Sequence, residues 1–378
     1  MDFELSEDQK SLVEAAREYG VRRLAPCYQE HQNTGIFDRE ILKEMGAMGF
    51  FGVELPERLG GLGLDTLTAG LVLEAISESD YNVAYLPISV SLISQMLMRG
   101  GKPEIVEPWI RKMISGDVFP AIALTEAGAG SDAAHITLRA EKVGDEYILT
   151  GEKTGISMAT QADFAVVMAR TGTVESGAKG VSAFLVPLEQ PTISRAALDA
   201  HGSHICGWGT IHFDGTRVPA SHLIGDENQA FSQLMAGFDY SRALIGIQSL
   251  AVARTSLDET WKWTRIRETF GHPIHDYQGV TFPLSEAETF LAGARLLCLQ
   301  TLWLKDKGLP HTVEAAMCKW WGPKLAYDIV LTCLKTHGWA GYTRDLPFEQ
   351  RMRDLLGLTI GDGTEQIMKM VIARKQGL

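Results

Sequence analysis

LTEAGAGSD, at residues 124–132, is a glycine-rich segment that lies where the sequence changes from a helical to a strand-like pattern. Glycine lets backbone N–H groups approach a bulky anionic ligand closely, so the segment is a candidate binding loop. Alone it is weak evidence, because an ordinary turn can have the same composition. It opens no strand–helix–strand unit, which argues against a dinucleotide site of the Rossmann type.

On the N-terminal side of this segment the sequence is predicted to be helical. Ser6 and Gln9 form a capping-box pattern that predicts the start of a first helix, which extends to about Arg22. The glycines at 60–63 interrupt the helical pattern. Further helices are predicted over residues 38–48, 65–78, 82–99 and 103–115.

On the C-terminal side apolar and polar residues begin to alternate near Val118, which predicts strands over residues 147–157, 162–170 and 181–188. From about Ala230 a long helix is predicted, followed by helices over 276–307, 311–337 and 363–376. We therefore expect a mainly α-helical fold with a central β domain. Its predicted parts are an N-terminal helical domain (1–117), a small antiparallel β-barrel domain (118–228) and a C-terminal four-helix bundle (229–378).

The composition limits the class of protein. With 378 residues, of which 45% are hydrophobic, the chain can bury a large core. A net charge of −12 makes it a poor ligand for nucleic acid or anionic membranes, since phosphate contacts need clustered basic side chains. No CxxC pair occurs, the N-terminus does not resemble a signal peptide, and the apolar stretch 83–98 is too short to cross a bilayer. We expect a cytoplasmic protein with no nucleic-acid partner and no membrane span.

One segment has side chains of the types that bind zinc, namely His201-Gly202-Ser203-His204-Ile205-Cys206. A zinc site needs further ligands, and no second ligand pair with suitable spacing stands out. No metal site is therefore predicted.

Three further motifs lie in the C-terminal part: RIRETFG at 265–271 with Gln278 after it, GWAGY at 338–342, and IGDGTEQI at 360–367. Each is ambiguous alone. In this order and spacing, together with LTEAGAGSD, they resemble the acyl-CoA dehydrogenase family over essentially the whole chain. The phrases FDYSR at 238–242 and GDGT at 361–364 resemble most closely the branch that acts on cyclohexanecarboxyl-CoA.

The resemblance implies FAD bound between the β domain and the bundle. Positions that match flavin or coenzyme A contacts are Leu124, Thr125, Gly130 and Ser131 in the glycine-rich loop, Ser157 at the flavin edge, His337 and Gly338 near the pyrophosphate, and Thr364 and Gln366. Four more match positions that reach the FAD of a neighbouring subunit: Arg267, Thr269, Phe270 and Gln278. A shared cofactor implies a homotetramer built as a dimer of dimers. The implied electron acceptor is an electron-transfer flavoprotein.

The implied reaction removes an α-proton and a β-hydride from an acyl-CoA, so it needs a base. The family's glutamate before Gly-Thr is replaced here by Asp362, whose side chain is shorter by about 1.5 Å. An alternative reading makes Asp362 the N-cap of the last helix. The second base position known in the family falls on Ser241, which cannot serve. If neither residue works, a carboxylate from another helix would attack a different carbon, as in a 1,4-elimination from a cyclohexene ring.

Two glycines bear on the shape of the substrate. Gly155 and Gly361 stand where many relatives have larger residues, and a wide pocket suits a ring or branched acyl group. Glycine could instead serve a backbone with positive φ. The helix over 82–99 is expected to line the pocket tail, and it offers no carboxylate, which disfavours the 1,4-elimination. The implied substrate contacts are Leu86, Val90, Ser91, Ser131, Phe238, Ser241, Arg242, Gly361 and Gly363, with a structural ion pair as the other role for Arg242.

Other functions on the same fold remain open. A linear or branched short-chain acyl-CoA is a second substrate class. A flavin oxidase or monooxygenase would differ in the oxygen reactivity of the reduced flavin, which the sequence does not define. A non-catalytic acyl-CoA-binding relative would not bleach its flavin with substrate.

Overall fold

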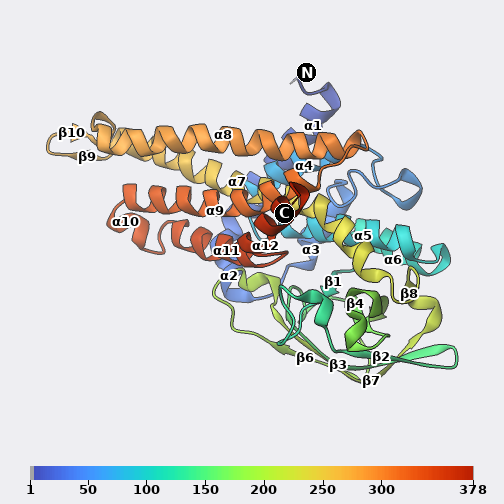
Figure 1. Ribbon diagram of the computed structural model, residues 1–378. Helices are drawn as coiled ribbons and strands as arrows, with labels where there is room; N and C mark the ends of the chain where they lie inside the picture. Colours follow the sequence, from blue (N-terminus) through green and yellow to red (C-terminus); the bar gives the residue numbers. More distant parts are fainter. Residues whose placement is uncertain (1–3, 378) are drawn as a thin grey trace.

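The computed structural model describes residues 4–377, without the side chains of residues 232–236. Helices from both ends of the chain lie together above the sheet domain, which is at the bottom of Figure 1. The mainly helical fold with a central β domain is confirmed. The N-terminal helices are α1 (Glu7–Tyr19), α2 (Tyr28–Thr34), α3 (Arg39–Ala47), α4 (Thr66–Ser77), α5 (Tyr85–Gly100) and α6 (Pro103–Ile114).

The first helix begins as the sequence predicts. The Ser6 hydroxyl accepts a hydrogen bond from the Gln9 backbone N–H at 3.2 Å, and the Gln9 side chain accepts one from the Ser6 N–H at 3.0 Å. The capping box is therefore confirmed. After Tyr19 the chain stays helical and continues as a π-helical turn over Gly20–Leu24.

The segment between α3 and α4 folds back on itself, and this explains its glycines. Gly52 O accepts a hydrogen bond from the Leu62 N–H at 2.8 Å, and Val53 O accepts one from the Leu64 N–H at 2.9 Å. A Cβ at Gly61 would lie 2.1 Å from the Leu55 carbonyl oxygen, so no other residue fits this close approach. The fold-back holds residues 52–55 against the helical core.

The strands of the β domain are β1 (Pro120–Ala123), β2 (Arg139–Val143), β3 (Glu146–Ile156), β4 (Phe164–Arg170), β5 (Val181–Pro187), β6 (Ile193–Ala197), β7 (Gly209–Pro219) and β8 (Leu223–Ile224). Their order is β6-β7-β3-β2-β4-β5-β8, and β1 pairs with β4. Most pairs are antiparallel, as expected. The pairs β1–β4 and β2–β4 are parallel, so the sheet is mixed, a detail that alternation alone does not predict.

The C-terminal elements are α7 (Ala230–Ile266), β9 (Glu268–Thr269), β10 (His272–Pro273), α8 (Gln278–Asp306), α9 (Thr312–Thr336), α10 (Trp339–Tyr342), α11 (Phe348–Ile360) and α12 (Glu365–Lys375). The long helix α9 packs against α7, α8, α11 and α12. It approaches α7 closely, because a Cβ at Gly322 would lie only 2.8 Å from Gly246 Cα. Helix α11 was not among the predicted helices, since many of its buried residues are polar.

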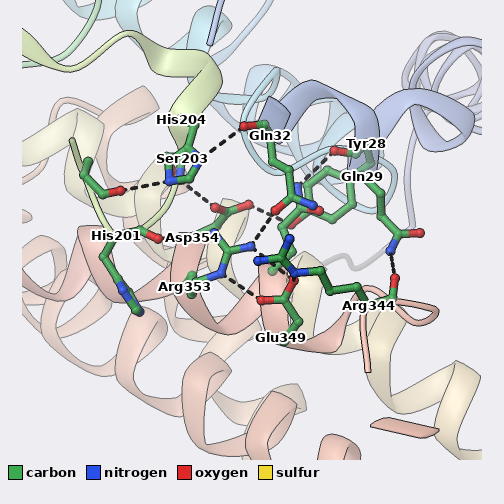
Figure 2. Close-up of polar contacts among 12 residues, drawn as sticks. Tyr28, Gln29, Gln32, His201, Ser203, His204, Arg344, Glu349, Arg353 and Asp354 are labelled. Atoms are coloured by element: carbon green, nitrogen blue, oxygen red, sulfur yellow. Dashed lines mark hydrogen bonds and ion pairs between the residues drawn. The ribbon is translucent and has the colours of Figure 1, made fainter. Parts of the chain in front are cut away.

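A buried carboxylate on α11 joins the three parts of the chain (Figure 2). Asp354 Oδ1 accepts from the Ser203 backbone N–H at 2.6 Å, and Oδ2 accepts from the Tyr28 hydroxyl at 2.8 Å and the Asn82 amide at 2.9 Å. The neighbouring Arg353 donates to the His201 carbonyl at 3.2 Å. The segment 201–206 thus anchors the β domain to the bundle and the N-terminal helices.

Within residues 4–377, no helix is both long enough and apolar enough to cross a bilayer.

Candidate functional site

Asp362 lies in the short loop between α11 and α12, in a left-handed backbone conformation with φ 54°. A non-glycine residue with this backbone carries strain of roughly 1–3 kcal/mol, which is common at functional sites. The cap of α12 is Thr364, whose hydroxyl accepts from the Ile367 N–H at 3.3 Å. The reading of Asp362 as the N-cap is therefore wrong, and its carboxylate is available for another role.

Two positively charged side chains face the Asp362 carboxylate. Lys319, on α9, is only 1% exposed and donates a hydrogen bond to the carbonyl oxygen of Gly363, the residue after Asp362. Arg242, on α7, pairs with Asp239 at 2.9 Å and leaves its Nε without a partner among the described side chains. Lys319 therefore holds the loop in place as well as balancing its charge.

These charges oppose the effect of burial on the acid. Burial raises the pKa of Asp362 above its usual value, while Lys319 and then Arg242 lower it. Burial also lowers the pKa of Lys319 to about 8, against the opposing effect of Asp362. Lys319 consequently keeps its proton near neutral pH, and its charge favours the ionised carboxylate that a base needs.

The backbone around Asp362 offers a free hydrogen-bond donor. The Gly361 N–H bonds to the Gly357 carbonyl at 2.9 Å, but the N–H of Asp362 makes no hydrogen bond within the described part of the chain. An unpaired N–H beside a carboxylate can bind a carbonyl oxygen that gains negative charge during a reaction.

Tyr85 and Ser157 form the opposite edge of the site. The Tyr85 hydroxyl donates to Ser157 Oγ at 3.3 Å, which joins the start of α5 to the residue after β3. Burial raises the pKa of Tyr85, and the charge of Asp362 raises it further. Asp362, Lys319, Arg242, Tyr85 and Ser157 are thus brought together from α5, α7, α9 and the loops after β3 and α11.

The glycine-rich loop after β1 is held by a buried ion pair. Glu126 accepts from Lys153 Nζ at 2.7 Å and from the backbone N–H groups of Thr137 and Leu138 at 2.7 and 2.9 Å. The same ammonium group donates to the Leu124 carbonyl at 2.8 Å. Sequence reasoning quoted Glu126 but did not identify this role.

The exposed side of this loop fits a bulky ligand. A Cβ at Gly128 or Gly130 would meet no atom within 4 Å, so neither packing nor positive φ requires glycine there. The backbone N–H groups of Gly130 and Ser131 make no hydrogen bond within residues 4–377. Open space and free N–H donors are what an anionic ligand needs. Leu124 and Thr125 are partly buried beside them.

A second group of predicted cofactor residues lies at one end of the bundle, far from the glycine-rich loop (Figure 1). Arg267, Thr269 and Gln278 are exposed around the β9–β10 hairpin, and Phe270 is 93% exposed with φ 52°. His337 is buried, with its ring stacked on Trp263 at 5.0 Å. Gly338 follows with φ 61°. Gln366 does not belong to this group, because it is exposed on α12, four residues after Asp362.

The predicted substrate residues fall into two sets. Leu86, Val90, Phe238, Ser241 and Arg242 are buried on α5 and α7. Ser91 lies deeper on α5 and donates a hydrogen bond to Glu54. The helix itself carries no carboxylate, as expected, but the fold-back at 52–55 brings Glu54 beside it from outside the helix.

Gly155 and Gly361, the two glycines expected to widen the pocket, differ in whether their backbone requires glycine. Gly155 has φ 64°, so its backbone requires glycine. Gly361 has φ −61° and ψ 159°, which any residue adopts, and a Cβ there would meet only ordinary contacts at 3.5 and 4.0 Å. At Gly361, unlike at Gly155, the backbone does not require glycine, so the missing side chain leaves space for another group. Gly363, with φ 99°, serves the turn.

Lys319 and Glu54 are among the residues near the site that sequence reasoning did not identify. Lys319 stands in the apolar run Cys318-Lys319-Trp320-Trp321, and a lone charge in such a run was a usable signal. No signal in the sequence pointed to Glu54, because its contact with Ser91 depends on the fold-back at 52–55.

No cluster of metal-ligating side chains occurs among the described residues. In the segment 201–206, His204 bonds instead to the carbonyls of Gln32 and Ala200, at 3.1 and 2.8 Å.

Comparison with known proteins identifies the family. Three family models match the chain in sequence: the acyl-CoA dehydrogenase N-terminal domain over residues 6–117, the middle domain over 121–216 and the C-terminal domain over 228–377. The caffeyl-CoA reductase-Etf complex subunit CarC of Acetobacterium woodii is 34% identical, over 97% of this chain and 98% of that protein.

Two solved structures share the whole fold. Butyryl-CoA dehydrogenase from Megasphaera elsdenii superposes with a TM-score of 0.95 at 28% identity, and PigA with FAD and proline with 0.95 at 26% identity. Each covers 100% of both chains. The chain therefore belongs to the acyl-CoA dehydrogenase family.

Proposed function

We propose that the chain oxidises the α,β bond of a cyclic acyl-CoA, cyclohexane-1-carboxyl-CoA, to the 1-ene thioester with Asp362 as the base. As a family member it is an FAD-dependent oxidoreductase that acts on the CH–CH bond of an acyl-CoA. The observation that carries the proposal is the Asp362 carboxylate, which stands on a strained backbone between Lys319 and Arg242. Bound FAD supplies the hydride acceptor.

Different residues of the chain would transfer the proton, stabilise the developing charge and hold the flavin. Asp362 takes the α-proton, and its backbone N–H donates to the thioester oxygen as negative charge develops there. Lys319 and Arg242 favour the ionised state of Asp362 before the proton moves. Gly130 and Ser131, with their free N–H groups, and Leu124, Thr125 and Ser157 would hold the flavin from one chain. Thr364 both caps α12 and lies beside this site.

The same site can work in reverse. The relative from Acetobacterium woodii is named as a reductase, and by microscopic reversibility Asp362 would then return a proton to the α-carbon. That relative is also named as a subunit of a complex with Etf, which supports an electron-transfer flavoprotein as the redox partner of this chain.

A second candidate reaction is 1,4-dehydrogenation of cyclohex-1-ene-1-carboxyl-CoA. Glu54 favours it, because a carboxylate now lies beside Ser91 on the pocket helix. Analysis of the product separates the two reactions, since only the 1,4-reaction gives a conjugated ring diene.

The two groups of cofactor residues support a shared FAD. One chain places the glycine-rich loop and the β9–β10 hairpin at different ends of the molecule, so one bound FAD would contact both groups only if two chains meet (Figure 1). The hairpin end also presents large exposed apolar side chains, with Phe270 93% and Trp339 78% exposed. Large exposed apolar groups of this kind mark protein interfaces. A homotetramer, as a dimer of dimers, satisfies both observations.

Replacing the base is the direct test of the reaction. Asp362→Asn should lower the rate of flavin bleaching by cyclohexanecarboxyl-CoA by about 10²–10⁴-fold, because an amide cannot accept the proton. Asparagine tolerates positive φ, so FAD binding should persist. Stopped-flow absorbance under anaerobic conditions gives the rate, with exposed Asp345→Asn as the control. Near-normal bleaching by the Asp362 variant would place the base elsewhere.

Removing the buried ammonium group should change the pH dependence. Lys319→Met takes away a charge that lowers the pKa of Asp362, so that pKa rises. The acid limb of the kcat/KM profile should therefore move to higher pH, with the largest loss of rate in acidic buffer. Lys335→Met, on the exposed side of the same helix, is the control and should keep the native profile. A uniform loss at every pH would assign Lys319 a purely structural role.

Filling the space at Gly361 should discriminate between rings and chains. In Gly361→Tyr the phenol projects into the open space beside Asp362, and overpacking costs roughly 1–3 kcal/mol, or about ten- to a hundred-fold in rate. The kcat/KM ratio of cyclohexanecarboxyl-CoA to butyryl-CoA should fall by this factor. Gly361→Ala adds only a Cβ in a permitted conformation and is the matched control. Equal losses for both substrates would contradict a ring pocket.

The oligomer can be tested at the hairpin. Phe270→Ser should reduce both the assembled fraction and the FAD bound per chain, because it removes an exposed apolar side chain at the proposed interface. Sedimentation velocity with absorbance at the flavin band measures both. Val174→Ser, at an exposed apolar position in the β domain, is the control. A native monomer that carries a full complement of FAD would disprove the shared site.

A further inference from the structure

The buried ion pair of Lys153 and Glu126 joins two segments that are both predicted to contact the flavin. Lys153, on β3, has a side chain that is 0% exposed, and its ammonium group donates to the Leu124 carbonyl at 2.8 Å and to Glu126 at 2.7 Å. Ser157 follows four residues later, directly after the same strand. One buried side chain therefore holds the glycine-rich loop against the strand that leads to Ser157.

The charge of Lys153 is maintained although its side chain is buried. Burial lowers the pKa of Lys153 to about 8, and the negative charge of Glu126 opposes that change. Arg170 is the other charge that acts on it, and Ile211 lies opposite it on β7. The ammonium group therefore keeps its proton near neutral pH and donates to both acceptors at once.

Glu126 is itself held by several further hydrogen bonds. One carboxylate oxygen accepts from the backbone N–H and the hydroxyl of Thr137, both at 2.7 Å, and the other accepts from the Leu138 N–H at 2.9 Å. Arg170 donates to the Ile136 carbonyl at 3.1 Å, so the segment before β2 is also fixed. The carboxylate thus has a defined position, and the ammonium group is held with it.

The contact with Lys153 sets the orientation of the peptide group between Leu124 and Thr125. In a trans peptide the C=O and N–H groups point in opposite directions, and no cis peptide bond occurs in the described chain. Because the Leu124 carbonyl points at the buried ammonium group, the N–H of Thr125 points away from it. That N–H makes no hydrogen bond within residues 4–377. The Thr125 carbonyl is fixed as well, since it accepts from the Thr154 N–H at 2.9 Å.

The N–H of Thr125 joins the unpaired donors already noted in the glycine-rich loop, those of Gly130 and Ser131. Thr125 is partly exposed, so its N–H can meet a ligand. The carbonyl oxygens of a flavin ring accept hydrogen bonds and gain negative charge when the ring is reduced. A fixed donor beside such an oxygen therefore favours the reduced cofactor.

We propose that Lys153 is a positioning residue for the cofactor, which turns the Thr125 N–H toward a carbonyl oxygen of the bound flavin ring. The inference deepens the proposed function, because it rests on the flavin contacts assigned to the glycine-rich loop. With its side chain 0% exposed, Lys153 acts through the peptide between Leu124 and Thr125. Without the ammonium group that peptide is free to rotate, and the donor is lost from the site.

The test replaces Lys153 and follows the flavin in the absence of substrate. Lys153→Met should raise the dissociation constant of FAD by roughly ten- to a hundred-fold, because the loop donors are no longer fixed. It should also shift the midpoint potential of the flavin that stays bound to lower values, because the reduced ring loses a donor. Flavin fluorescence on dilution of the holoprotein gives the affinity, and reductive titration against a reference dye gives the potential.

A double variant separates positioning from stability. Lys153→Met leaves the Glu126 charge buried without its ammonium partner, which lowers the melting temperature. In Lys153→Met/Glu126→Gln that charge is gone, so the melting temperature should rise again while the affinity and the potential stay altered. Recovery of all three together would give Lys153 a purely structural role and overturn the inference. The double variant also keeps the test valid if the single variant does not fold.

Ile211→Val, opposite Lys153 on β7, is the matched control. It removes one buried methyl group, so it should lower the melting temperature slightly and leave both flavin properties native. Native affinity and potential in Lys153→Met would show that the peptide after Leu124 needs no support. An unchanged potential in the double variant would place the Thr125 N–H away from the flavin ring. Either result overturns the inference.

Failure of the proposed function has a different signature. A native enzyme that holds FAD normally but is not bleached by cyclohexanecarboxyl-CoA would contradict the proposed reaction and leave the role of Lys153 standing. Bleaching at the native rate together with native flavin properties in Lys153→Met would do the reverse.

Discussion

The Asp354 carboxylate is the interaction on which the site depends. It accepts hydrogen bonds from Tyr28, Asn82 and Ser203, one donor from α2, one from the segment before α5 and one from the β domain (Figure 2). Burial raises the pKa of Asp354, and these donors oppose that rise. The hydrogen bonds offset the free-energy cost of burying the acid, and they fix the three parts of the chain relative to one another. Asp362 follows eight residues later, in the loop after the same helix.

The contacts around Asp362 fix the position of an aspartate where the family has a longer glutamate. The aspartate reaches less far than a glutamate, but its loop is tied to α9 by Lys319 and ended by the Thr364 cap. Its left-handed backbone is strained, and the surrounding bonds are what keep it in place. The two buried cations oppose the rise in the pKa of Asp362 that burial causes. Position and charge are thus controlled by the same side chain, Lys319.

A single chain does not bring all the predicted cofactor residues together. The glycine-rich loop presents free N–H groups at the β domain, whereas Phe270 and its neighbours are exposed at the far end of the bundle. This arrangement has a cost in an isolated chain, because a strained, exposed phenylalanine stabilises nothing there. A second copy of the chain that covers the hairpin would bury Phe270 and so offset this cost. Catalysis and assembly would then depend on the same residues.

Much of the fold followed from the sequence because the signals are local. The Ser6 capping box, the helical periods and the alternation after Val118 each depend on neighbours within a few residues. The ordered motifs likewise indicated the family and singled out Asp362. Tertiary structure alone decided that Thr364 and not Asp362 caps α12, that Gly155 serves the backbone while Gly361 leaves space, and that Lys319 and Glu54 belong to the site. The contacts of Lys319 with Gly363 and of Glu54 with Ser91 join residues dozens of positions apart, and only the packing of the helices determines which distant side chains meet.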